Sequence, residues 1–215
     1  MKLHLTTLSL FLFCLLPFAV FGQEDLTNNP PVTNEWLVIP GQQVGAISAQ
    51  TTRTTLTKHF SRRAIRDYTA ATPNGIQYLS TVNEQTANSI TVFWTNENRN
   101  TVHSVEINGW IGSNWYLQNG LRVGLTLYGQ LLDINQQPVG FKGFFNEKQG
   151  GVITNWNGGR LGSLENKVKV QLWYSGSCEL TELNSYNFLG NKTHSSNEER
   201  AQFLELRVYR ITVFL

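Results

Sequence analysis

The sequence predicts an α+β protein made of two tandem units, each with a short helix layer on a four-stranded antiparallel sheet. A pattern of one amphipathic helix followed by alternating apolar stretches occurs twice along the chain. The spacing of glycine and leucine repeats with it. Only 15% of the residues are charged, and threonine and asparagine are abundant, which is typical of strand-rich exported proteins.

The first unit is predicted over residues 44–110. Residues 51–60 form its helix, because Thr51 or Thr52 can cap the start and Leu56 and Phe60 stand four apart on one face. Its strands are predicted from alternating stretches at residues 64–68, 75–79, 89–94 and 102–107. The polar run between the last two stretches is a hairpin loop.

The second unit is predicted over residues 111–215. Residues 126–136 form its helix, which carries Leu127, Leu131 and Leu132 and is closed by Pro138. Its strands are expected at residues 141–145, 152–156, 168–173 and 206–215, with a long polar segment at 175–200. Leu131 follows Gly120 by the same interval that separates Leu56 from Gly45, which indicates an internal repeat.

Residues 1–22 have the pattern of a cleavable export signal. Lys2 precedes an apolar run that ends in small residues, with Val20 and Gly22 at positions −3 and −1 of the cut. The alternative, a membrane anchor, needs about 20 apolar residues, and the run is shorter than that. After cleavage, residues 23–43 are expected to form a disordered leader and a short strand, and no membrane span is expected to remain.

Charge and cysteine content narrow the class of protein. Removing Lys2 from the 17 basic residues leaves 16 against 15 acidic ones, a net charge of +1, which disfavours nucleic acid as a partner. Cys14 lies in the signal, so Cys178 has no partner for an internal disulfide. We expect a periplasmic or secreted protein held together by core packing.

The run from Leu121 to Pro138 resembles the start of the helix in β-lactamase-inhibitor-protein-like domains and in related small outer-membrane-assembly lipoproteins. More broadly, residues 41–215 resemble uncharacterised exported proteins of Gram-negative bacteria. This likeness is carried by short motifs, namely Val44 to Ile47, Gly140 to Phe144, Gly150 to Trp156, Leu189-Gly190 and Val208 to Ile211. The resemblance implies helix-plus-sheet units in tandem and a place in the cell envelope, and it implies no activity.

The sequence offers little catalytic chemistry. His59, His103 and His194 lie in no metal-binding spacing, so no metal is expected. No glycine-rich loop precedes a helix in the way that phosphate binding requires, and no cofactor is expected. Cys178, with a histidine as its base, would be the centre of a cryptic hydrolase, although no known enzyme signature surrounds it.

Two groups of residues are candidates for binding. Trp110, Trp115 and Trp156 lie in Gly- and Asn-rich surroundings, where exposed rings could stack on a sugar or a protein, or else cap the core of the sheet. Arg62 and Arg63 belong to a basic stretch after the first helix that could meet an anionic partner or form a solvated face.

From these observations we predict a non-enzymatic protein-binding module of the cell envelope, whose sheet surface contacts another macromolecule. The alternatives are a carbohydrate-binding protein that uses the loop tryptophans and a hydrolase around Cys178. The expected partner is an envelope protein or a glycan.

Overall fold

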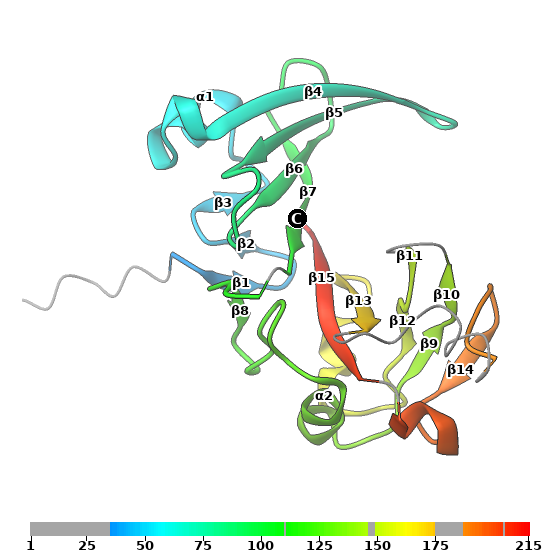
Figure 1. Ribbon diagram of the computed structural model, residues 1–215. Coiled ribbons are helices and arrows are strands. Elements are labelled where there is room, and N and C mark those ends of the chain that lie inside the picture. The colour runs from blue at the N-terminus through cyan, green and yellow to red at the C-terminus, as the bar shows by residue number, and fades with distance from the viewer. Residues whose placement is uncertain (1–34, 110, 146–148, 175–186, 204) are drawn as a thin grey trace, which may run out of the picture. The chain divides into compact units, whose positions relative to one another are not determined.

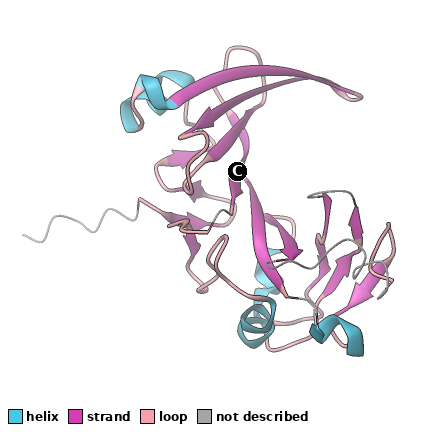
Figure 2. Ribbon diagram, viewed as in Figure 1, coloured by secondary structure: helices cyan, strands magenta, loops and turns pink. Residues whose placement is uncertain are grey.

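The fold is α+β, with strands predominating over two short α-helices (Figures 1 and 2). The computed structural model describes residues 35–109, 111–145, 149–174, 187–203 and 205–215. Within these ranges, no helix has both the length and the apolar character needed to cross a membrane.

The largest element is a six-stranded antiparallel sheet with the strand order β13-β15-β7-β6-β5-β4. Its strands are β4 (Ile65–Thr72), β5 (Gly75–Val82), β6 (Ile90–Trp94), β7 (Val102–Asn108), β13 (Val168–Tyr174) and β15 (Leu206–Phe214). β4 to β7 follow one another as a meander and overlap the four strands that the sequence predicts for the first unit. Alternate residues of β6, β7 and β15 are fully buried, so one face of this sheet lies on the core.

The helix α1 (Arg53–His59) begins where the sequence predicts. Thr52 is its N-cap, and the Thr52 and Thr55 side chains bond to each other's backbone N–H in a capping box. Leu56 is fully buried, and Phe60, the C-cap residue, packs partly against the core. A 3₁₀ turn, η1 (Arg62–Ala64), then leads into β4.

A second sheet contains the short apolar run near the beginning of the described chain. It has the order β3-β2-β1-β8, with β1 (Leu37–Ile39), β2 (Gln43–Val44), β3 (Ile47–Ser48) and β8 (Tyr116–Leu117). β1 and β8 are parallel, and the other pairs are antiparallel. The sequence predicts a short strand at β1, but it does not predict β2 or β3.

The region after β8 contains the helix α2 (Tyr128–Asn135) and two small sheets. One sheet has the order β12-β9-β14, and the other pairs β10 with β11. Their bounds are Gly140–Lys142 for β9, Phe144–Phe145 for β10, Gln149–Gly150 for β11, Ile153–Asn155 for β12 and Thr193–Ser195 for β14. The 3₁₀ turns η3 (Arg160–Leu164) and η4 (Glu199–Phe203) complete it.

The predicted arrangement of two separate four-stranded units is wrong. β13 and β15, expected in a sheet of the second unit, instead extend the first sheet, because β15 pairs with β7. That pairing sets Ile211 against Ile107 and Val213 against Val105, which places buried residues of both strands on one face. The strands left behind are only two or three residues long, and they make small sheets of their own.

Candidate functional site

Two of the three tryptophans singled out from the sequence are buried. Trp115 and Trp156 are 1% and 6% exposed, so of the two alternatives their rings fit capping of the core and not stacking on a ligand. The Trp115 Nε1 donates to the Asn88 carbonyl at 3.2 Å, and its ring meets Trp36 edge to face at 5.0 Å. Trp110 lies outside the described residues.

The two arginines singled out from the sequence lie on the surface. Arg62 and Arg63 are exposed in η1, and neither forms an ion pair within the described ranges. Their neighbours Arg53 and Arg66 are engaged, with Asp67 and Glu84 respectively. The basic stretch is therefore divided between cations that hold the fold and cations that face solvent.

Among the candidates for catalysis, the three histidines lie on three different elements. His59 and His103 are exposed, on α1 and β7 respectively. His194 is buried, with its Nδ1 3.3 Å from the Glu198 carboxylate and its ring against Phe188. No cluster of three or more metal-ligating residues occurs among the described residues, and Cys178 lies outside them.

One concave site lies between β8 and α2. The chain leaves β8, turns at Gly120 and crosses β15, where Gly124 N–H donates to Val208 O at 2.7 Å. A Cβ on Gly109 would lie 2.6 Å from the Gly124 nitrogen and 2.3 Å from the Tyr209 carbonyl oxygen. Glycine is therefore needed at 109 for this close crossing, which fixes the position of the segment that carries Arg122.

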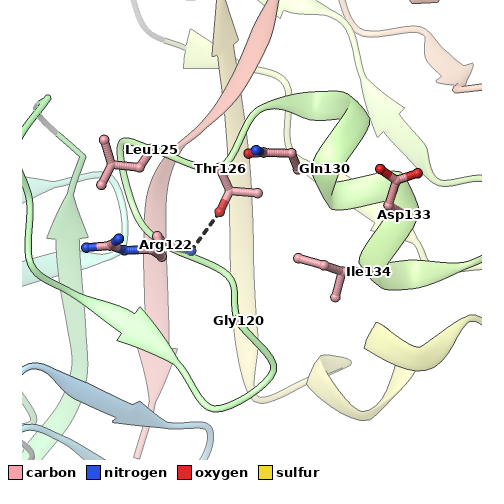
Figure 3. A pocket seen from close by; sticks show the side chains of 7 residues that line it. All are labelled: Gly120, Arg122, Leu125, Thr126, Gln130, Asp133 and Ile134. Carbon is pink, nitrogen blue, oxygen red and sulfur yellow. Dashed lines mark hydrogen bonds between the residues drawn. The ribbon is translucent and has the colours of Figure 1, made fainter.

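A turn holds the middle of this segment. The backbone N–H of Arg122 donates to Thr126 Oγ1 at 2.7 Å, and Thr126 N–H donates back to Arg122 O at 3.0 Å (Figure 3). Gln130 caps α2, since its Oε1 accepts from Leu127 N–H at 3.0 Å. The Arg122 side chain is left exposed.

The cavity has two adjoining parts that share Gly120 and Arg122. The helix lobe has a volume of about 480 Å³, and the aromatic lobe has about 500 Å³. The helix lobe is also lined by Leu125, Thr126, Gln130, Asp133 and Ile134, and the aromatic lobe by Trp36, Asn114 and Tyr116. We call the two lobes together the Arg122 groove.

A second candidate is the far end of the β4–β5 hairpin, which we call the arm (residues 68–78). β5 pairs with β6 only from Tyr78 onward, so the rest of the arm has two strands only (Figure 1). The face that is buried nearer the core continues along it to Ile76, which is 64% exposed. No charged residue occurs between Asp67 and Glu84.

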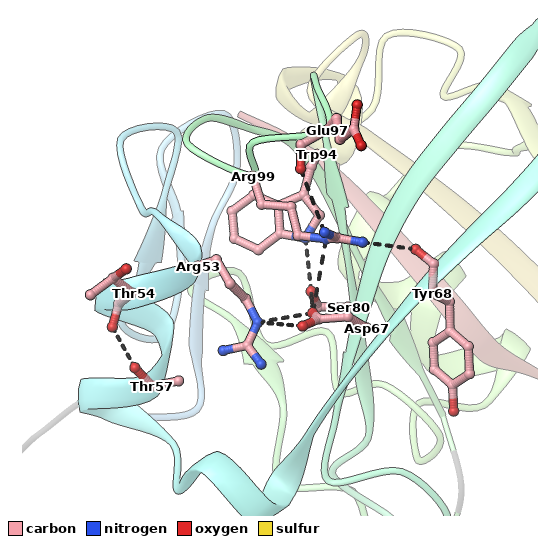
Figure 4. Close-up of polar contacts among 9 residues, drawn as sticks. All are labelled: Arg53, Thr54, Thr57, Asp67, Tyr68, Ser80, Trp94, Glu97 and Arg99. Carbon is pink, nitrogen blue, oxygen red and sulfur yellow. Dashed lines mark hydrogen bonds and ion pairs between the residues drawn. The ribbon is translucent and has the colours of Figure 1, made fainter.

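The base of the arm is fixed by a polar cluster (Figure 4). Arg53 Nε donates to both oxygens of the Asp67 carboxylate at 2.9 Å, and the Ser80 hydroxyl also donates to that carboxylate. Trp94 Nε1 donates to Ser80 Oγ at 2.9 Å, in a buried position. The cluster therefore ties α1, β4, β5 and β6 together at one place.

Arg99, in the loop between β6 and β7, completes this base. Its Nε lies 3.9 Å from the Asp67 carboxylate, which is an ion-pair distance but too long for a hydrogen bond. Its Nη2 donates to Tyr68 O at 3.3 Å, and its guanidinium lies 5.8 Å from the Tyr78 ring centre. Two cations thus share one carboxylate where the arm begins.

The comparisons with known proteins give little beyond a partial structural likeness. No protein-family model and no curated protein matches the sequence. Among solved structures, the chain is similar to the uncharacterized protein YfeY from Escherichia coli, with 14% identity and a TM-score of 0.47. The match covers 82% of this chain and 99% of that one.

Sequence reasoning missed both the groove and the arm. The groove joins Trp36 to residues about eighty positions further along, and no periodic pattern encodes that contact. The arm had a visible signal: an uncharged, β-branched and aromatic run around the Pro73-Asn74 turn. The pattern predicts the hairpin, but the number of neighbouring strands follows only from the sheet.

Proposed function

We propose that this chain is an exported, non-enzymatic protein-binding module of the cell envelope, and that the arm is its docking element. The partner supplies an extended segment that adds as a further strand to β4. The observation that carries the proposal is that, in the part of the chain that the structure describes, β4 ends the six-stranded sheet and no strand pairs with its outer edge, next to the exposed Ile76. Unprotected strand edges are templates for pairing with another chain.

The backbone geometry of β4 supports strand addition. Ala64 O accepts from Asn83 N–H at 2.9 Å, and hydrogen-bonded pairs alternate along an antiparallel ladder. Thr69 and Ala71 therefore direct their backbone N–H and C=O groups toward the free edge. These residues lie opposite Tyr78 and Ile76, so an added strand could also cover the apolar end of the arm.

The polar cluster at the base supports the same role. A two-stranded hairpin alone is marginally stable in water, because too little apolar surface is buried. Arg53 and Arg99 already hold the start of the arm in place. Less conformational entropy is therefore lost when a partner binds. Export is proposed from the signal pattern at residues 1–22, and the envelope setting from the resemblance to exported tandem-unit proteins.

Site-specific photocrosslinking in the source cells tests the proposal. A photoreactive residue in place of Thr69 should give one dominant adduct with another protein, whereas the same residue in place of exposed Ser163 should not. A synthetic peptide of the crosslinked segment should then bind the purified protein. Ala71→Pro should weaken that binding by at least about tenfold, because proline removes the outward N–H. An adduct formed only between two copies of this chain, or none, would contradict the proposal.

The cellular location of the protein is tested by a separate experiment. The mature protein recovered from cell fractions should begin at Gln23 and should be found outside the cytoplasm. Protein that still begins at Met1 and is found in the cytoplasmic fraction would contradict export.

A further inference from the structure

We propose that the Arg122 groove binds a neutral oligosaccharide, with the aromatic lobe and the helix lobe each taking one part of the ligand. This inference does not rest on the docking role of the arm, because the groove is formed by other residues. It concerns a small polyhydroxyl ligand and not a protein.

The groove offers complementary hydrogen-bonding groups that the fold does not use. Arg122 is a donor only and Asp133 is an acceptor only, and neither forms an ion pair in the part of the chain that the structure describes. Asn114 and Gln130 add amide groups, and the Gln130 oxygen already caps α2, which leaves its NH₂ for a ligand. A sugar hydroxyl both donates and accepts, so it can bond to each of these.

The aromatic lobe supplies the apolar contact that a sugar ring needs. Trp36 and Tyr116 are half-buried, and Tyr116 is held in place because its N–H donates to Trp36 O at 3.1 Å. The Trp36 ring is braced edge to face by buried Trp115. The faces of aromatic rings are negative, so they attract the C–H edges of a pyranose.

The charge and the space favour a neutral and extended ligand. The residues that line the helix lobe include one cation, Arg122, and one anion, Asp133, so this lining has no net charge to select a charged ligand. Nothing lies within 4 Å of the place that a Cβ on Gly120 would occupy, so the chain leaves open space at this residue, which lines both lobes. Each lobe has a volume within the range of ordinary ligand pockets, about 300–1,000 Å³.

Titration of the mature protein with chitotetraose and with cellotetraose tests this site. The readouts are tryptophan fluorescence and NMR saturation transfer from protein to sugar. We expect saturable binding of at least one tetrasaccharide below about 10 mM. Arg122→Gln and Asp133→Asn should each weaken it by at least about tenfold, and Trp36→Phe should weaken it less because a ring is kept.

Matched controls separate the groove from general charge effects. Lys169→Gln and Glu165→Gln remove charges of the same signs at exposed positions on β13 and after η3, and they should leave the affinity unchanged. Ala71→Pro should also leave it unchanged, so a failed arm would not affect this result. The proposal is overturned by an absence of saturable tetrasaccharide binding, or by equal binding to the groove variants. Binding of tetra-alanine alone, with the same sensitivity to Arg122→Gln, would also overturn it in favour of a peptide site.

Discussion

The two halves of the chain reach the same six-stranded sheet by different routes. β4 to β7 are consecutive in sequence, and each strand pairs with the next one along the chain. β13 and β15 are separated by about thirty residues, and β15 closes on β7, about a hundred residues earlier. The first half is therefore held by local pairing, whereas the second half depends on an edge that the first half provides. A repeated sequence pattern does not ensure a repeated structure, because the second copy can pair with the first.

The largest expected effect comes from emptying the core of either half. Phe141 is fully buried against the rings of Tyr128, Phe144 and Phe188. Leu56 is the fully buried residue of α1. We expect Phe141→Ala to lower the free energy of unfolding by about 3–5 kcal/mol and Leu56→Ala by about 2–5 kcal/mol. Both should shift one common urea transition, because β15 belongs to the shared sheet.

Circular dichroism and tryptophan fluorescence, followed through the same urea titration, check this. Coincident curves for the wild type and both variants would support one cooperative unit. Two separate transitions, each shifted by one variant only, would show that the halves unfold independently.

The crossing of the two halves at Gly109 should be nearly as sensitive. A methyl group at this position would overlap the Tyr209 carbonyl and the Gly124 backbone, neither of which can rotate away. We expect Gly109→Ala to destabilise the protein by about 2–3 kcal/mol, whereas Gly162→Ala, where a Cβ meets nothing within 4 Å, should cost far less. Thermal unfolding of both variants distinguishes them, and equal melting temperatures would contradict the close crossing.

A smaller effect is expected at the base of the arm. Asp67→Asn removes the charge that Arg53 and Arg99 share, and it leaves two cations near one neutral amide. Since the carboxylate is partly exposed, we expect a loss of only about 1–2 kcal/mol. Hydrogen exchange should show faster opening of β4 and β5, with β13 and β15 unchanged. Uniformly faster exchange would mean that the cluster does not act locally.

The smallest effect at neutral pH, and a distinct one at high pH, is expected at Tyr128 in α2. Burial raises the pKa of Tyr128 above its usual value of 10.0; the nearby Ser196 hydroxyl lowers it in part, and the Glu198 carboxylate adds to the rise. The hydroxyl has no partner of good hydrogen-bond geometry among the described residues, so Tyr128→Phe should change stability little at pH 7.

The sign of the pH effect follows from this shift. Above pH 10 the unfolded tyrosine loses its proton while the folded one keeps it, so wild-type stability should fall as the pH rises. Tyr128→Phe should make this fall shallower. Urea unfolding at pH 8.5 and about pH 11 measures it, and parallel losses in the two proteins would contradict a buried neutral Tyr128.

Local chemistry in the sequence was enough to predict much of the first half. The threonine cap at 52 and the apolar spacing around Leu56 predict α1 to within two residues, because both signals act within one helical turn. The alternation of Ile90, Val92 and Trp94 predicts β6 and its buried face. Even in the second half, the leucines before Pro138 correctly predict a helix.

The tertiary structure alone decided which edges pair and which aromatic rings stay exposed. The alternation of apolar residues in 206–215 predicts the strand β15, but it does not say which strand β15 pairs with. The structure pairs β15 with β7, whose residues also alternate between apolar and polar. Trp36 and Trp115 each follow polar residues and precede apolar or aromatic ones in sequence, yet Trp115 is enclosed by Trp36 and the Asn88 carbonyl while Trp36 lines the groove. Burial depends on residues brought together across the fold, and for that reason no local pattern could distinguish the two rings.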